Sequence, residues 1–232
     1  MLKKFLCAMS VAVLMFSSLG CGKQEVPETR ELTEEYAMEY VLNLASYENI
    51  EVSVVKDSLD DETVEDYADF YYKELASKVE GLTDAEGNLL PFSDETVAML
   101  GSEAFSTVSE FMVFTRKTAK EYIDEKFKRQ VFEEAIEQVV EKSVFGETDP
   151  AVLEGMKQYV FEDYSKLAAE YDMDVDTYAK YLETSVYELC EDYARLQAVC
   201  TLIAREQGID TKDRDTMFSL VTDYIFSVTK TE

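Results

Sequence analysis

Apolar side chains recur every three or four residues along most of this chain of 232 residues, which is the spacing of amphipathic helices. The longest such run, 107–142, contains neither glycine nor proline and predicts one helix of about 36 residues. Shorter helices are predicted over 31–44, 58–78, 93–101, 151–171, 174–182 and 184–207, and from 213 onward. The pattern therefore predicts an all-α, mainly helical fold with one long helix.

Start and stop residues support these boundaries. Ser58 and Ser93 are candidate N-caps, because a side-chain oxygen there can accept a hydrogen bond from the first helical turn. Asp149 is another candidate cap, and Pro150 suits the first helical position that follows it. Gly208 follows the penultimate predicted helix and is placed to end it.

The chain is predicted to consist of a leader (1–20), a tether (21–30) and one helical domain (31–232). Inside that domain, 47–56 alternates like a β-strand and is expected to form a short extended linker segment rather than a sheet. The parts expected within the domain are a linker strand, helix and loop over 47–91, a helical core over 92–210 and a terminal helix over 211–232.

The first 21 residues have the order of a secretory signal, in which basic, apolar and small residues follow one another. The apolar run 5–16 is too short for a membrane span, which needs about 20 residues. Cys21 then resembles the modified cysteine of the bacterial lipobox, although Ser18 stands where that motif more often has leucine. The resemblance implies export, lipidation of Cys21 and anchoring at the outer face of the cell membrane. The alternative is an ordinary signal peptide that is cut elsewhere.

The net charge of the chain restricts the kinds of molecule that it is expected to bind. The chain has 22 Lys and Arg against 49 Asp and Glu, a net charge of −27. Such a surface repels nucleic acid and anionic lipid, so no nucleic-acid partner is expected. Because 47% of the residues are hydrophobic and 12% aromatic, the chain is expected to fold in spite of this charge.

The residues that most enzymes need are scarce. The sequence has no histidine, which excludes Ser-His and Cys-His catalysis, and it contains no phosphate loop, nucleophile elbow or HExxH motif. Cys190 and Cys200 fall on one predicted helix about 15 Å apart, too far to pair with each other, and are expected to be buried. We therefore predict a protein that is not an enzyme and has no cofactor.

Two charged segments each have more than one interpretation. Asp172, Asp174, Asp176 and Glu183 have the acidic spacing of a calcium loop, but Thr177 stands where the loop needs glycine. The favoured alternative is a helix N-terminus with acids that complement its dipole. The second segment is a basic stretch of the long helix, which could hold acidic client segments, lie against the protein's own acids, or form a solvated face with i,i+4 pairs. Its residues are Arg116, Lys117, Lys120, Lys126, Lys128 and Arg129.

Three segments resemble one known family. Residues 90–164 contain PFSDETVAMLG, then TVSEF, a long helix ending in EAIEQVVEKSVF, and a turn with DP before a new helix. This order is similar to the C-terminal, substrate-cradling domain of trigger factor, and 171–210 and 40–65 are similar to its later helices and its entering linker. The resemblance implies a helical cradle with a long arm helix, a design shared with the periplasmic chaperone SurA.

The departures from trigger factor limit what this resemblance implies. Nothing in the chain matches the ribosome-docking domain, and 81–90 is far too short for the prolyl isomerase domain at that place. Isomerase activity and ribosome contact are therefore not expected. What remains is binding of unfolded or nascent exported polypeptides, with the membrane reached only through the N-terminal lipid.

Adaptable binding of such chains needs exposed aromatic or methionine side chains. The candidates lie on the long helix and on the helix after it, although each of them could instead belong to the core. They are Phe111, Met112, Phe114, Tyr122, Met156, Tyr159 and Phe161. The predicted function is a lipid-anchored, chaperone-like protein without catalysis, and the alternative is a structural or accessory lipoprotein that binds one specific partner through its long helix.

Overall fold

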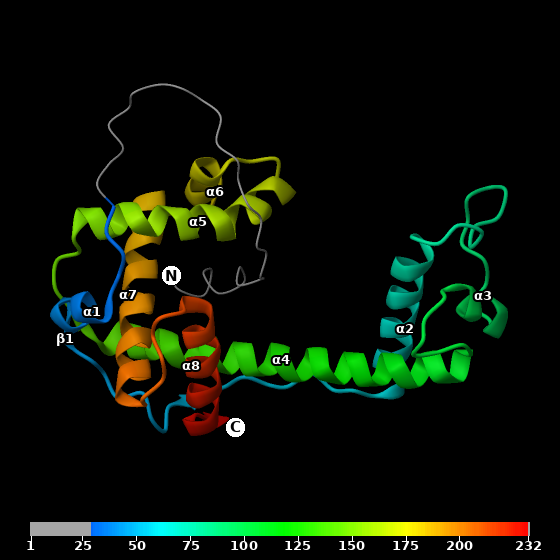
Figure 1. The fold of residues 1–232 in the computed structure, drawn as a ribbon, viewed down its shortest axis with the longest axis horizontal. Coiled ribbons are helices and arrows are strands. Elements are labelled where there is room, and N and C mark those ends of the chain that lie inside the picture. Colours follow the sequence, from blue (N-terminus) through cyan, green and yellow to red (C-terminus); the bar gives the residue numbers. More distant parts are fainter. Residues whose placement is uncertain (1–28, 232) are drawn as a thin grey trace. The chain divides into compact units, whose positions relative to one another are not determined.

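The computed structural model describes residues 29–231, so the predicted leader, Cys21 and most of the tether lie outside the described residues. The described chain is mainly helical, as predicted (Figure 1). Its helices are α1 (Glu34–Tyr40), α2 (Asp61–Ala76), α3 (Asp94–Met99), α4 (Val108–Lys142), α5 (Pro150–Glu170), α6 (Val175–Tyr181), α7 (Val186–Glu206) and α8 (Arg214–Val228). Its strands are β1 (Val41–Asn43), β2 (Glu51–Val52), β3 (Val144–Phe145) and β4 (Lys230–Thr231). No helix within 29–231 is both long and apolar enough to cross a membrane.

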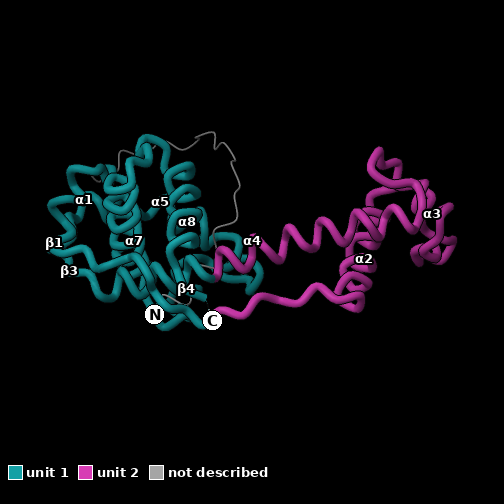
Figure 2. The backbone as a smooth tube through the Cα atoms, turned by 90° about the horizontal axis from the view of Figure 1, so that it is seen from below, with its two compact units in different colours: residues 1–53, 131–232 teal, residues 54–130 magenta. Residues whose placement is uncertain are grey.

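The chain divides into two compact units, where the sequence predicts one domain (Figure 2). Unit 1 comprises residues 1–53 and 131–232, and unit 2 comprises residues 54–130. The division falls inside α4, whose 35 residues confirm the predicted long helix. The reason for two units is that residues 54–130 bury an aromatic core of their own.

Unit 1 is built around α7, which packs against α1, α5, α6 and α8. Buried residues lie on most sides of α7, as expected for a helix covered by neighbours all round. Cys190 and Cys200 are both free and buried in this core, and burial raises the pKa of each thiol. The two cysteines are core residues, as predicted.

Two short strand pairs tie distant segments of unit 1 together. β1 pairs antiparallel with β3, and β2 pairs in parallel with β4. The predicted helix 31–44 is wrong in its last turn, because α1 ends at Tyr40 and Val41 pairs with Phe145 instead. The Tyr40 and Phe145 rings are 5.3 Å apart, so packing against a residue more than a hundred positions away replaces the local helical pattern.

Unit 2 packs α2, α3 and the first half of α4 around phenylalanine side chains. Phe111 is fully buried, and its ring lies 4.9 Å from that of Phe105 and 5.4 Å from that of Phe92. Tyr72 of α2 also packs on Phe92, at 5.1 Å, and its hydroxyl donates a hydrogen bond to the carbonyl of Leu90. This contact fastens the 77–93 loop to α2.

The helix caps agree with the sequence at most ends. Ser93 caps α3 in a reciprocal capping box, and Asp149 caps α5 with Pro150 in the first turn. Gly208 has a φ of +69°, the left-handed conformation predicted for the residue that ends α7. The cap of α2 was predicted wrongly: it is Asp60, not Ser58, and its carboxylate accepts a hydrogen bond from the Thr63 amide.

Candidate functional site

The seven predicted binding residues fall into three groups by exposure. Phe111 and Met156 are buried in the cores of units 2 and 1, so they do not belong to a surface. Met112, Phe114 and Tyr159 are partly exposed. Tyr122 and Phe161 are exposed over 51% and 41% of their surfaces. The structure thus retains Tyr122 of α4 and Phe161 of α5 as the most accessible candidates.

Tyr122 does not stand alone, because aromatic residues of α2 surround it. Its ring lies 6.0 Å from that of Tyr67 in an edge-to-face arrangement. Tyr67 stacks on Tyr71 at 6.1 Å, and Tyr71 meets Phe70 edge-on at 5.7 Å. Phe70 is 59% exposed. These four residues, Tyr67, Phe70, Tyr71 and Tyr122, form a continuous surface that we call the α2–α4 aromatic face.

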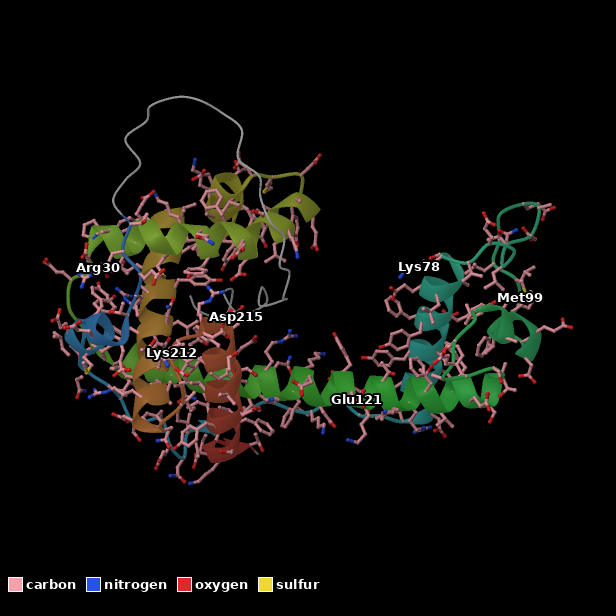
Figure 3. All side chains as sticks on the ribbon, viewed as in Figure 1. Arg30, Lys78, Met99, Glu121, Lys212 and Asp215 are labelled. Atoms are coloured by element: carbon pink, nitrogen blue, oxygen red, sulfur yellow. The ribbon has the colours of Figure 1, made fainter. Side chains whose placement is uncertain are left out.

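The sequence of α2 explains how this face forms. The segment DYADFYY places Tyr67 and Tyr71 one helical turn apart, on the side of α2 that meets α4. Phe70 lies beside that stripe rather than on it, and its side chain is therefore left exposed. Figure 3 shows the side chains of this unit, with Glu121 labelled on α4 immediately before Tyr122 and Lys78 beyond the end of α2.

The cations near the aromatic face are paired with acids. The guanidinium of Arg116 contacts the Asp61 carboxylate, and the Lys126 ammonium lies 2.7 Å from Asp57. Asp124 is shared by Lys120, at 2.6 Å, and by Lys56. Arg116 and Lys126 thus lie against acids of the protein that are distant in the sequence, whereas Lys117 and Lys120 form the i,i+4 pairs expected of a solvated helix face. These pairs do not neutralise α2, because its exposed Glu62, Glu65 and Asp66 have no ion pair among residues 29–231.

The phenols of Tyr67 and Tyr71 are held in the protonated form. Burial raises the pKa of Tyr67 and, likewise, of Tyr71, and the neighbouring Tyr122 raises both further. Because a neutral phenol is easier to desolvate than a phenolate, this favours contact with apolar groups. The face offers apolar and π contacts together with hydroxyl groups.

One other predicted binding residue, Phe114, borders a hollow at the start of α4. Phe114 and its exposed neighbour Val113 line a shallow depression of about 380 Å³. Its remaining lining residues are Ala104, Ser109, Glu110 and Lys117. In unit 1, the ring of Tyr159 is covered by the Arg214 guanidinium at 3.8 Å, which leaves that ring less available to a ligand.

The predicted acidic segment starts a helix. Asp174 caps α6, and its carboxylate accepts a hydrogen bond from the Thr177 amide at 2.7 Å. This supports the helix N-terminus rather than the calcium loop. Among residues 29–231, no three His, Cys, Asp or Glu side chains converge in a way that could hold a metal ion.

Comparisons with known proteins give no family for this chain. No protein-family model matches it, and no curated protein matches it either. The functional argument therefore depends on the surfaces of the two units themselves.

Proposed function

We propose that this protein binds apolar segments of non-native polypeptides on the α2–α4 aromatic face and catalyses no reaction. The observation that carries the proposal is the joint exposure of Phe70 and Tyr122 within one four-ring surface. Exposed apolar side chains that adjoin one another are typical of interaction sites, whereas isolated ones are ordinary.

The surroundings of the face also support this proposal. The cations of α4 nearest the face are engaged in ion pairs, Arg116 with Asp61 and Lys126 with Asp57, so they do not select for an acidic ligand. Aromatic rings provide a large contact area with few rotatable bonds, so they can pack against many sequences at low entropic cost. The net charge of −27 would keep a loaded complex soluble.

The place of action is proposed from the sequence alone. Residues 1–21 favour export and a lipid anchor at Cys21. An anchored binding protein would meet polypeptides at the outer face of the cell membrane as they emerge unfolded from export.

An aggregation assay tests the function. Several unrelated proteins are diluted from denaturant, and light scattering is followed with the full chain or with its Phe70→Ser/Tyr122→Ser variant. We expect protection by the natural chain and loss of most of it in the variant, since both substitutions remove exposed aromatic area. The matched control is Tyr187→Ser, an equally exposed tyrosine in unit 1, which should protect like the natural chain.

Two outcomes would contradict the proposal. One is that no client is protected while a single native protein binds tightly, which would favour the accessory-lipoprotein alternative. The other is full protection by the Phe70→Ser/Tyr122→Ser variant, which would place binding elsewhere. Circular dichroism of each variant shows whether its helices are retained.

A further inference from the structure

A second aromatic surface lies in unit 1, and it is formed by the residue that follows α5 and by two residues of α6. The rings of Tyr171 and Tyr178 are 5.6 Å apart, those of Tyr171 and Tyr181 are 5.7 Å apart, and those of Tyr178 and Tyr181 are 6.0 Å apart. The planes of each pair are inclined by 25–33°. The three tyrosines therefore form one cluster of mutually contacting rings, which we call the tyrosine plate.

The plate combines a buried base with an exposed outer face. Tyr178 is buried and packs towards Tyr164 of α5, whose ring is 6.1 Å away. Tyr171 and Tyr181 are 52% and 58% exposed. The turn between α5 and α6 is fixed by a hydrogen bond from the Met173 amide to the Ala168 carbonyl at 2.9 Å. The rings thus stand on an ordered part of the chain and are open to a ligand.

The charges next to the plate are almost all negative. Segment 170–183 contains the carboxylates Glu170, Asp172, Asp174, Asp176 and Glu183 and one cation, Lys180. Asp174 is engaged as the cap of α6. The other four carboxylates are exposed, and none of them forms an ion pair with any residue in 29–231. At the α2–α4 aromatic face, by contrast, cations of α4 pair with Asp61 and Asp57.

Other aromatic rings of unit 1 already contact arginine side chains of the same chain. Its own arginines lie over aromatic rings in unit 1: Arg214 over Tyr159, Arg30 over Tyr36 and Arg195 over Phe145, at 3.8, 5.2 and 5.7 Å from the ring centroids. Within the described part of the chain, no cation takes this position over Tyr171 or Tyr181. Two exposed tyrosine rings bordered by unpaired carboxylates are thus left without a cation.

We propose that the tyrosine plate binds arginine or lysine side chains of a cationic polypeptide segment. The negative face of each ring attracts the cation, and the neighbouring carboxylates add Coulomb attraction that the ring alone cannot supply. Arginine should bind better than lysine, because its planar guanidinium stacks on a ring and is more weakly hydrated. This site is separate from the α2–α4 aromatic face and does not depend on the function proposed for it.

Fluorescence anisotropy tests the site with a labelled peptide of three arginines separated by alanines. A peptide with citrulline in place of each arginine keeps the shape of the side chain and removes its charge. With the full chain at low salt, the arginine peptide should bind about tenfold more tightly than the citrulline peptide. Tyr171→Leu/Tyr181→Leu should weaken arginine-peptide binding by about tenfold, whereas Tyr171→Phe/Tyr181→Phe should bind like the natural chain because it retains both rings.

Charge variants test the carboxylates separately. Asp172→Asn/Asp176→Asn should weaken binding of the arginine peptide and reduce its dependence on salt, since fewer charges then contribute. Asparagine is suitable at position 172 because the residue has a φ of +59°, a conformation that asparagine tolerates. Circular dichroism serves as the folding control for every variant.

Three results would overturn the inference. They are equal binding of the arginine and citrulline peptides, unchanged binding by Tyr171→Leu/Tyr181→Leu, and displacement of the arginine peptide by a neutral oligosaccharide that binds the plate more tightly. The Phe70→Ser/Tyr122→Ser variant separates this inference from the proposed function, because it should bind the arginine peptide normally. If that variant loses the arginine peptide, the peptide binds in unit 2, whatever the aggregation assay shows.

Discussion

The α2–α4 aromatic face and the tyrosine plate use the same kind of side chain in different electrostatic surroundings. In unit 2, Asp57 and Asp61 are each paired with a cation of α4. In unit 1, Asp172 and Asp176 beside the plate have no such partner among the described residues. The rings supply contact area in both places, and the pairing of the neighbouring charges determines which ligands each surface favours.

Exposed rings alone therefore do not determine which ligand a surface binds. The α2–α4 aromatic face is expected to gain mainly by removing apolar area from water, which salt does not weaken. An acidic aromatic surface gains mainly by attracting cations, which salt screens over roughly 10 Å at 0.1 M. Added salt should therefore weaken ligand binding at the tyrosine plate and should not weaken it at the α2–α4 aromatic face.

The largest expected effect comes from a substitution in the core of unit 2, which disrupts the α2–α4 aromatic face. Phe111→Ala leaves a cavity among the Phe92 and Phe105 rings and should cost about 3–5 kcal/mol of the stability of unit 2. Hydrogen exchange should accelerate in 54–130 and remain unchanged in α5 and α7. The variant should lose aggregation protection and keep arginine-peptide binding.

The matched control for this substitution is Val113→Ala, at an exposed position of the same helix, which should change exchange little. Equal acceleration of exchange in both units would show that they unfold as one body, and the independence of the two surfaces would then be lost.

A smaller effect concerns the pH dependence of stability, in which the partly buried Asp163 of unit 1 should differ from the exposed acids. Asp163 of α5 accepts a hydrogen bond from the Tyr193 hydroxyl, and burial raises its pKa to about 6, although Arg214 opposes the shift. Because this pKa lies above the usual 3.8, the folded state retains a proton that the unfolded state releases. The contribution of Asp163 to stability therefore falls as the pH rises from about 4 to about 6 and stays low above it.

Asp163→Asn should remove that pH dependence and stabilise the chain at pH 7 by about 1–2 kcal/mol, since the amide needs no proton and still accepts from Tyr193. Urea unfolding followed by circular dichroism between pH 4 and 7 measures both effects. Asp172→Asn, at an exposed position, removes one carboxylate in the same way and serves as the matched control. An unchanged slope in Asp163→Asn would refute the assignment to Asp163.

The smallest expected effect comes from removing two cations beside the α2–α4 aromatic face, which leaves its acids unpaired like those beside the tyrosine plate. Arg116→Gln/Lys126→Gln leaves Asp61 and Asp57 unpaired beside the α2–α4 aromatic face. Stability should change by less than about 1 kcal/mol, because both pairs are at the surface. Arginine-peptide binding should rise by about two- to threefold at low salt, and the gain should vanish at high salt.

Lys157→Gln/Lys212→Gln makes the same change in net charge in unit 1 and is the matched control. If the control raises arginine-peptide binding as much, the effect comes from net charge and not from local pairing at the aromatic face.

Much of the fold follows from local sequence signals. The caps Ser93 and Asp149 and the uninterrupted run of α4 act over a few residues, so their pattern is sufficient to predict them. The end of α1 at Tyr40 could not be found in this way, because it depends on the pairing of Val41 with Phe145. The division into two units likewise depends on which aromatic residues share a core.

The candidate surfaces were only partly predictable for a similar reason. Tyr122 was identified on the long helix, whereas Phe111 has the same helical pattern but faces the core. Phe70 was missed, and so was Tyr181. The available signal was an aromatic residue that lies off the apolar stripe of its helix, as Phe70 does in α2. Which stripe faces the core is decided by tertiary packing.

Side-chain footprinting with hydroxyl radicals tests the central claim most directly, because it reads the exposure of each ring in solution. The full chain is labelled alone, with an uncharged, apolar unfolded client, and with the arginine peptide. We predict that the client protects Phe70 and Tyr122 and leaves Tyr171 and Tyr181 reactive, and that the arginine peptide does the reverse. Unchanged reactivity of Phe70 and Tyr122 with the client bound, or one set of rings protected by both ligands, would contradict the account.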